Sequence, residues 1–167
     1  MTIRTETQVT QVHRVYIKAT PQTVWDAITK PEWTARYGYR VLAQYDLRAG
    51  GRARNLWSEQ MRKAHDLPEV AVDGEVIEAD PPRKLVQTWR LTMDRETASE
   101  GFTRLTWEID EGKGGVTRLT VIHELDGAPK TAALVGGEMA DTGAGGGWSW
   151  VLSEMKTLLE TGASFEA

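Results

Sequence analysis

The sequence of 167 residues contains no cysteine, and its aromatic residues include only two phenylalanines against seven tryptophans. The absence of cysteine excludes disulfides and thiolate metal ligands, which is typical of proteins in a reducing compartment. The scarcity of phenylalanine means that an apolar interior is lined largely by indoles, each of which carries one N–H donor. We therefore expect a core or a cavity whose aromatic surface can also donate hydrogen bonds.

Long apolar runs and an excess of positive charge are also missing. No run approaches the ~20 residues of a membrane span, and the opening MTIRTETQVTQV is polar and lacks the apolar centre of a signal peptide. The formal net charge is −4, with lysine and arginine spread along the chain rather than gathered in a basic stripe. These features predict a cytoplasmic protein with no membrane insertion and no nucleic-acid partner.

The spacing patterns of metal, nucleotide and hydrolase sites are absent as well. His13, His65 and His123 have no ligand-like spacing, and the segment GAGGGW lacks the Lys-Ser/Thr pair of a phosphate loop. There is no Gly-x-Ser-x-Gly elbow. We therefore expect no metal and no cofactor, whereas catalysis stays open because the members of a triad can be scattered along a chain.

The length suits one domain, which we place at residues 10–162 with flexible termini at residues 1–9 and 163–167. A β-rich segment at residues 12–19 leads to Thr20 and Pro21, an N-cap followed by proline at the first helical position. This first helix should end near Lys30, because the residue before a proline is driven out of the helical region. A second short helix is expected at residues 31–37.

Beyond residue 41 the pattern changes to strands with turns between them, at residues 41–48, 52–60, 69–80, 84–92, 102–110 and 116–125. In the last segment, residues 145–162, Trp148, Leu152, Met155 and Leu159 repeat at helical spacing before Gly162. The order predicts an α+β fold in which a curved antiparallel sheet of six to seven strands wraps around a long C-terminal helix.

Such a helix cannot fill a strongly curved sheet from end to end, so we expect an apolar ligand cavity between helix and sheet. Strand alternation and helix spacing predict its lining residues as His123, Gln87, Trp89, Trp107, Val121, Trp148, Leu152 and Met155, and we add Trp150 as the second tryptophan at the start of the same helix. The alternative for the tryptophans is that they only fill the core. The alternative for His123 is a structural hydrogen bond to a carbonyl, an indole or a buried water.

Four segments, read in order, resemble one known family: VYIKATPQTVWDAITKPEWTARY, GEVIEADPPRKLVQTWR, TRLTVIHEL and GWSWVLSEMKTLLETG. The chain is similar to START-like proteins of the SRPBCC superfamily, and within it to homologues of the activator of the heat-shock protein 90 ATPase. The resemblance implies the helix-grip fold of the birch pollen allergen. It carries no shared catalytic set.

The function that the resemblance implies is the binding of a hydrophobic small molecule, such as a lipid, an aromatic or a polyketide-like compound, by a carrier or sensor. The alternatives are a cyclase or dehydratase acting in the same cavity, and a co-activator of a chaperone ATPase. A homodimer is left open. Residues 127–147 and 58–68 depart from the family pattern and are expected near the cavity rim.

Overall fold

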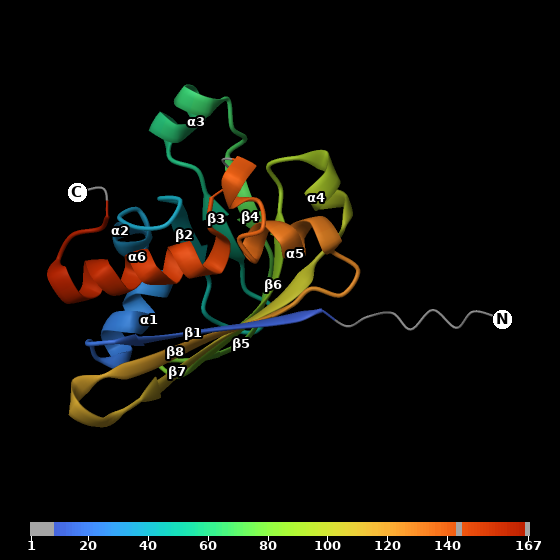
Figure 1. Cartoon of the computed structure of the whole chain (residues 1–167). Helices are drawn as coiled ribbons and strands as arrows, with labels where there is room; N and C mark the ends of the chain where they lie inside the picture. Colours follow the sequence, from blue (N-terminus) through green and yellow to red (C-terminus); the bar gives the residue numbers. More distant parts are fainter. Residues whose placement is uncertain (1–8, 143–144, 166–167) are drawn as a thin grey trace.

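The structure is a computed structural model that describes residues 9–142 and 145–165. It is an α+β fold in which an antiparallel, curved sheet carries helices on one side (Figure 1). The predicted fold class is therefore confirmed. The predicted flexible termini fall largely on residues 1–8 and 166–167, which lie outside the described residues.

The described part of the chain has an eight-stranded sheet in the order β1-β8-β7-β6-β4-β3-β2, with β5 also paired to β6. The strands are β1 (Thr10–Ile17), β2 (Leu42–Tyr45), β3 (Ala53–Leu56), β4 (Val70–Asp73), β5 (Val76–Asp80), β6 (Lys84–Leu91), β7 (Thr103–Glu111) and β8 (Thr117–Glu124). The α-helices are α1 (Pro21–Thr29), α2 (Pro31–Thr34), α3 (Glu59–His65), α4 (Arg95–Ser99), α5 (Pro129–Val135) and α6 (Gly147–Thr161).

The boundaries of α1 and α6 follow the predicted signals. The side chain of Thr20 accepts a hydrogen bond from the Thr23 backbone N–H at 3.1 Å, and Pro21 occupies the first turn of α1. The C-terminal helix ends at Gly162, whose left-handed conformation lets its N–H reach the Leu158 carbonyl oxygen.

The predicted strand at residues 69–80 is divided at Gly74, which explains why the sheet has more strands than predicted. Its two halves, β4 and β5, lie along the same edge of β6, with Asp73 opposite Arg90 and Val76 opposite Gln87. A side chain at Gly74 would place its Cβ 1.9 Å from the carbonyl oxygen of Thr88 in β6. The backbones at Gly74 and Thr88 therefore lie closer together than a residue with a side chain at position 74 would allow. The strand pairing along β6 is interrupted there.

Three helices were not predicted. The strand predicted at residues 52–60 was expected to end in a polar hairpin end at residues 58–68, but Ser58 accepts a hydrogen bond from the Met61 backbone N–H at 3.2 Å and caps α3. Asp94 caps α4 in the same way, and α5 begins at Pro129 inside the glycine- and alanine-rich segment. Short helices of this kind depend on local caps more than on apolar periodicity, so the strand and helix patterns missed them.

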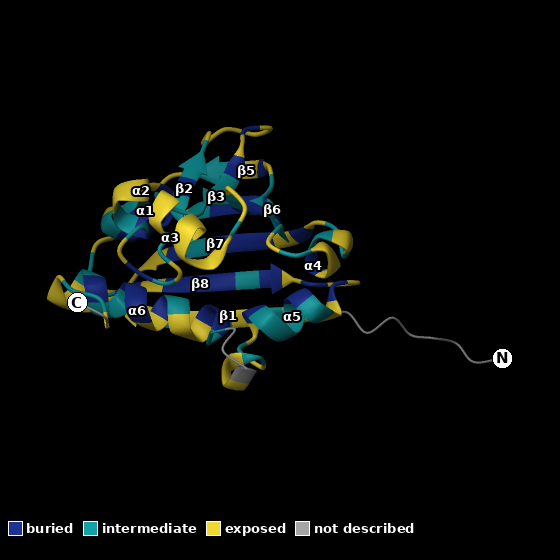
Figure 2. Ribbon diagram, turned by 90° about the horizontal axis from the view of Figure 1, so that it is seen from above, coloured by how far each residue is buried: buried dark blue, intermediate teal, exposed yellow. Residues whose placement is uncertain are grey.

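The core lies between the sheet and α6. Figure 2 shows β7 and β8 as largely buried strands, with α6 and α5 running beside them and β1. The buried face of α6 is wider than its predicted stripe, because it includes Glu154, which is 1% exposed. One turn before Glu154, Val151 lies against the loop at Gly38, so a second side of the helix is covered.

Candidate functional site

The candidate site is the inner face of β6, β7 and β8 under the first turn of α6. Antiparallel register places Gln87 opposite Leu105, Leu105 opposite His123, and Trp107 opposite Val121, so alternate residues of the three strands form one surface. Each of these side chains points inward because strand alternation repeats every second residue. Trp148, in the first turn of α6, packs on this surface.

Three indoles meet here, and we call Trp89, Trp107 and Trp148 the indole cluster. The centroid of the Trp148 ring lies 5.3 Å from that of Trp107, edge to face, and 6.2 Å from that of Trp89. The imidazole of His123 lies edge to face with both Trp89, at 4.9 Å, and Trp148, at 5.9 Å. These are favourable aromatic geometries, so the four rings hold one another in place.

His123 belongs to a hydrogen-bond chain whose direction is fixed. The indole N–H of Trp148 can only donate, so the imidazole Nδ1 accepts it at 3.1 Å. Nε2 therefore carries the ring proton and donates to the Thr103 hydroxyl at 2.7 Å, while that hydroxyl donates to the Trp89 carbonyl oxygen at 2.8 Å. Both ring nitrogens have partners within the protein, as the structural alternative for His123 expects.

The environment of His123 keeps its ring neutral. Burial, with a smaller contribution from the nearby charge of His13, lowers the pKa of His123 to about 3. A neutral imidazole with both nitrogens engaged is poorly suited to donate or accept a proton near neutral pH.

Gln87 is the second buried polar side chain of the site. Its Oε1 accepts hydrogen bonds from the Tyr45 hydroxyl at 2.9 Å and from the Trp107 indole N–H at 3.2 Å. Burial raises the pKa of the Tyr45 phenol, so this hydroxyl keeps its proton. Because Trp107 can only donate, the amide cannot be turned around. Its Nε2 then has no hydrogen-bond partner among the described residues, a state that costs ~1–3 kcal/mol when the donor is buried.

The structure brings together all the predicted lining residues except one. Val121, Leu152 and Met155 are buried beside the aromatic rings. Trp150 is 37% exposed, and its ring packs edge to face on Phe165 at 5.2 Å. Two positions along a helix differ by about 200° in direction, so Trp150 faces away from the side that Trp148 occupies.

Two residues of the site were not predicted. Thr103 shares the alternation of Trp107 on β7, a signal that strand parity could have supplied. Tyr45 reaches Gln87 from β2, where it lies opposite Ala53 of β3. That contact depends on sheet register between distant segments and has no local sequence signal.

Side chains occupy much of the space in which the sequence predicts a cavity. Val121, Met155, Gln87 and His123 have 0% accessible surface, so no water-sized space borders them. The indole cluster keeps 6–7% of its surface accessible. A ligand that approached this layer would therefore meet indole surface first.

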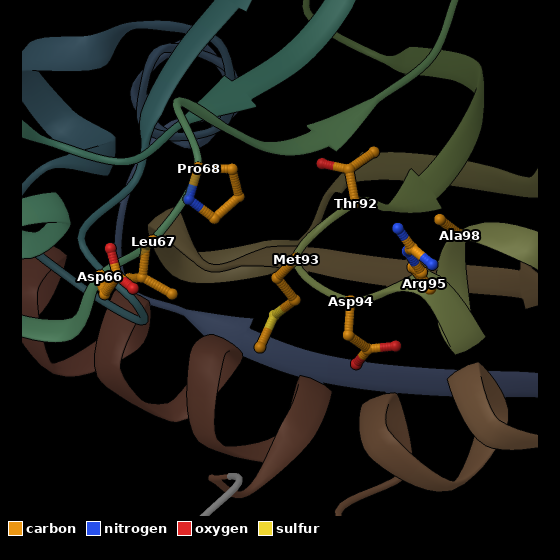
Figure 3. A pocket seen from close by; sticks show the side chains of 8 residues that line it. All are labelled: Asp66, Leu67, Pro68, Thr92, Met93, Asp94, Arg95 and Ala98. Carbon is orange, nitrogen blue, oxygen red and sulfur yellow. The ribbon is translucent and has the colours of Figure 1, made fainter.

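An open groove of about 540 Å³ lies at the α3 and α4 end of the fold. Its lining residues are Asp66, Leu67, Pro68, Thr92, Met93, Asp94, Arg95 and Ala98. Figure 3 shows the loop after α3, with Leu67 and Pro68, across from the loop after β6, with Met93 and Asp94. A second hollow of about 550 Å³ on α3 shares Asp66 and Leu67 with it.

Nowhere in the described part of the chain do three or more histidine, aspartate or glutamate side chains gather so that they could hold a metal ion. No helix within residues 9–142 and 145–165 has both the length and the apolarity needed to cross a bilayer.

The family model described as "Activator of Hsp90 ATPase homolog 1-like protein" matches residues 18–160. The chain belongs to this family. A search for relatives among proteins of curated function gives no match. The matched span runs from the residue after β1 to the last turn of α6, so it includes the whole candidate site.

Several solved structures share the fold. CalU16 from Micromonospora echinospora is 21% identical, with a TM-score of 0.56 over 81% of this chain and 73% of its own. PFC0360w, an HSP90 activator from Plasmodium falciparum, is 18% identical, with a TM-score of 0.60 over 90% and 95%. DynU16, a protein of the dynemicin biosynthetic locus, is 20% identical, with a TM-score of 0.61 over 93% of this chain and 48% of its own. At these identities the likeness shows the fold alone.

Proposed function

We propose that the protein binds a hydrophobic small molecule against the indole cluster, as a carrier or sensor. The observation that carries the proposal is that Trp89 and Trp107 of the sheet meet Trp148 of α6 beside two buried polar side chains. Ligand sites in proteins typically combine aromatic walls with a few placed polar groups. Here those polar groups are Gln87 and His123, and the indoles keep the accessible surface.

Strand β6 leads from the open groove to the cluster. Gln87 and Trp89 face inward, Leu91 follows on the same side and is half-buried, and Met93 two residues later lines the groove. In this proposal, an entering ligand follows the side chains of Met93, Leu91 and Trp89.

Helix α3 is suited to move aside on entry, because none of its residues is buried. Its displacement would expose no core side chain, so the helix itself resists opening only weakly. In Figure 1, α3 stands farther from the sheet than α5 and α6. The loop that follows α3 forms one wall of the groove.

Affinity would come from burial. A ligand that loses on the order of 200 Å² of apolar surface gains about 5 kcal/mol before ordering costs are subtracted. Part of this gain offsets the shift of indole side chains that must separate to admit it. Compact aromatic or alicyclic compounds fit this requirement better than extended chains, because they stack on indole faces.

The alternatives have less support. A cyclase or dehydratase would need a proton donor or acceptor in the cavity, and the neutral, doubly bonded His123 is a poor one. The chaperone co-activator alternative rests on the family name.

The test is a panel of lipids, aromatic compounds and polyketide-like compounds, followed by native mass spectrometry and tryptophan emission. We expect a saturable 1:1 complex and a change in emission for at least one aromatic member. Trp150→Phe, an exposed position, should keep the response, whereas Trp107→Phe should weaken it. If no compound forms a complex and none shifts emission or melting temperature, the proposal is wrong.

A further inference from the structure

Gln87 has a fixed orientation and an unused donor group. The Trp107 N–H and the Tyr45 hydroxyl both point at Oε1, which leaves the two N–H bonds of Nε2 directed elsewhere. Nε2 is buried and has no partner among the described residues. Native proteins rarely leave such a group unpaired, so each case calls for an explanation.

The residues opposite Gln87 on the adjacent strands supply no side-chain acceptor. Its register partners are Val76 on β5 and Leu105 on β7, which are apolar and fully buried. The polar groups nearest to it, on Tyr45 and Trp107, are donors that already use its oxygen. Nε2 is therefore a buried donor without an acceptor among the described residues.

We propose that Nε2 of Gln87 donates to a carbonyl oxygen of an uncharged aromatic ligand, which reaches it when the indole side chains of the cluster separate and pack on the ligand. This inference rests on the proposed function and names the ligand class for the same site. The residues of the site supply no cation, since His123 is neutral, so a carboxylate would be buried without a counter-charge. A ketone or quinone oxygen meets the need without that cost.

The first test compares two probes with the same ring system, 9-fluorenone and fluorene, which differ by a carbonyl in place of a methylene. Dissociation constants are measured by tryptophan emission for the wild type, Gln87→Met and Gln22→Met. Gln22 is exposed on α1, so its variant is a matched control. We expect the wild type and the control to bind the ketone at least tenfold tighter, a difference of ~1.4 kcal/mol. In Gln87→Met the two probes should bind alike.

A second measurement keeps the inference testable if Gln87→Met does not fold. In the ¹⁵N-labelled wild type, the Gln87 side-chain amide protons should move downfield with fluorenone and stay nearly unchanged with fluorene. Equal affinity of the two probes, or an amide resonance that responds to neither, overturns the inference and leaves the proposed function standing. If neither probe nor any panel compound binds, both fail together.

Discussion

The indole Nε1 of Trp148 donates a hydrogen bond to the imidazole Nδ1 of His123 over 3.1 Å, and this contact joins the first turn of α6 to the end of β8. Apolar packing has no direction, so it could hold the helix at several rotations about its axis. A bond between two buried polar atoms allows one rotation. The position of α6 over the sheet is thus set by a specific pair as well as by burial.

Because of this hydrogen bond, replacing Trp148 by phenylalanine should lower the free energy of unfolding more than the same change at Trp150. Trp148→Phe removes the N–H donor and leaves Nδ1 of His123 buried without it, so the free energy of unfolding should fall by ~1–3 kcal/mol, plus a packing loss. Trp150→Phe alters an exposed ring and should stay within about 0.5 kcal/mol of the wild type. Urea unfolding followed by circular dichroism measures both. Equal losses would mean that the Trp148 bond does not contribute.

The hydroxyl of Thr103 completes the chain from His123 to the Trp89 carbonyl. Thr103→Val keeps the shape of the side chain but leaves Nε2–H of His123 without its acceptor, so we expect a loss of ~1–3 kcal/mol. Thr103→Ser restores the hydroxyl and should recover most of that loss. If valine and serine are equally tolerated in urea unfolding, the chain has no energetic role.

The lowered pKa of His123 predicts a specific pH dependence. The unfolded imidazole titrates near 6.5 and the folded one at about 3, so between these values only the unfolded state takes up the proton. The contribution to stability is complete above pH 6.5 and is lost as the pH falls toward 3, with ~1.4 kcal/mol for each unit between the two pKa values. The pKa of His13 is lowered by burial too and acts in the same direction.

Unfolding free energies at pH 7, 6, 5 and 4 for the wild type and His123→Gln test this dependence. Glutamine does not titrate, so the wild type should lose its advantage over the variant as the pH falls. A difference between the two proteins that stays constant over this range would show that His123 titrates alike in both states.

The close approach at Gly74 predicts a steric effect. Gly74→Ala would place a methyl group 1.9 Å from the Thr88 carbonyl oxygen, so β4 and β5 must shift away from β6. We expect a loss of ~1–3 kcal/mol or more in urea unfolding, as for other overpacked positions. A fully stable Gly74→Ala protein would mean that the strands part readily here.

Much of the fold was predictable because its signals are local. The proline and cap at residues 20 and 21, the alternation on β6, β7 and β8, and the apolar spacing on α6 each specify one element without knowledge of the others. The same alternation correctly placed Gln87 and His123 on one buried face. The short helix α3 was not predicted, because its start depends on a single cap at Ser58.

Only those site residues that follow strand alternation or helix spacing could be predicted from the sequence. Trp150 was misplaced because residue type suggested burial while its angle on α6 turns it toward Phe165. Tyr45 was missed because its contact with Gln87 spans 42 positions along the chain. The amount of open space between α6 and the sheet depends on how the large side chains interlock, and composition does not determine this.

Nuclear Overhauser effects between bound 9-fluorenone and the protein test most directly whether the indole cluster holds a hydrophobic ligand. We expect contacts from fluorenone protons to the indole rings of Trp89, Trp107 and Trp148. Saturable binding with contacts confined to Met93 and Leu67 in the outer groove, or to Trp150 and Phe165, would contradict it.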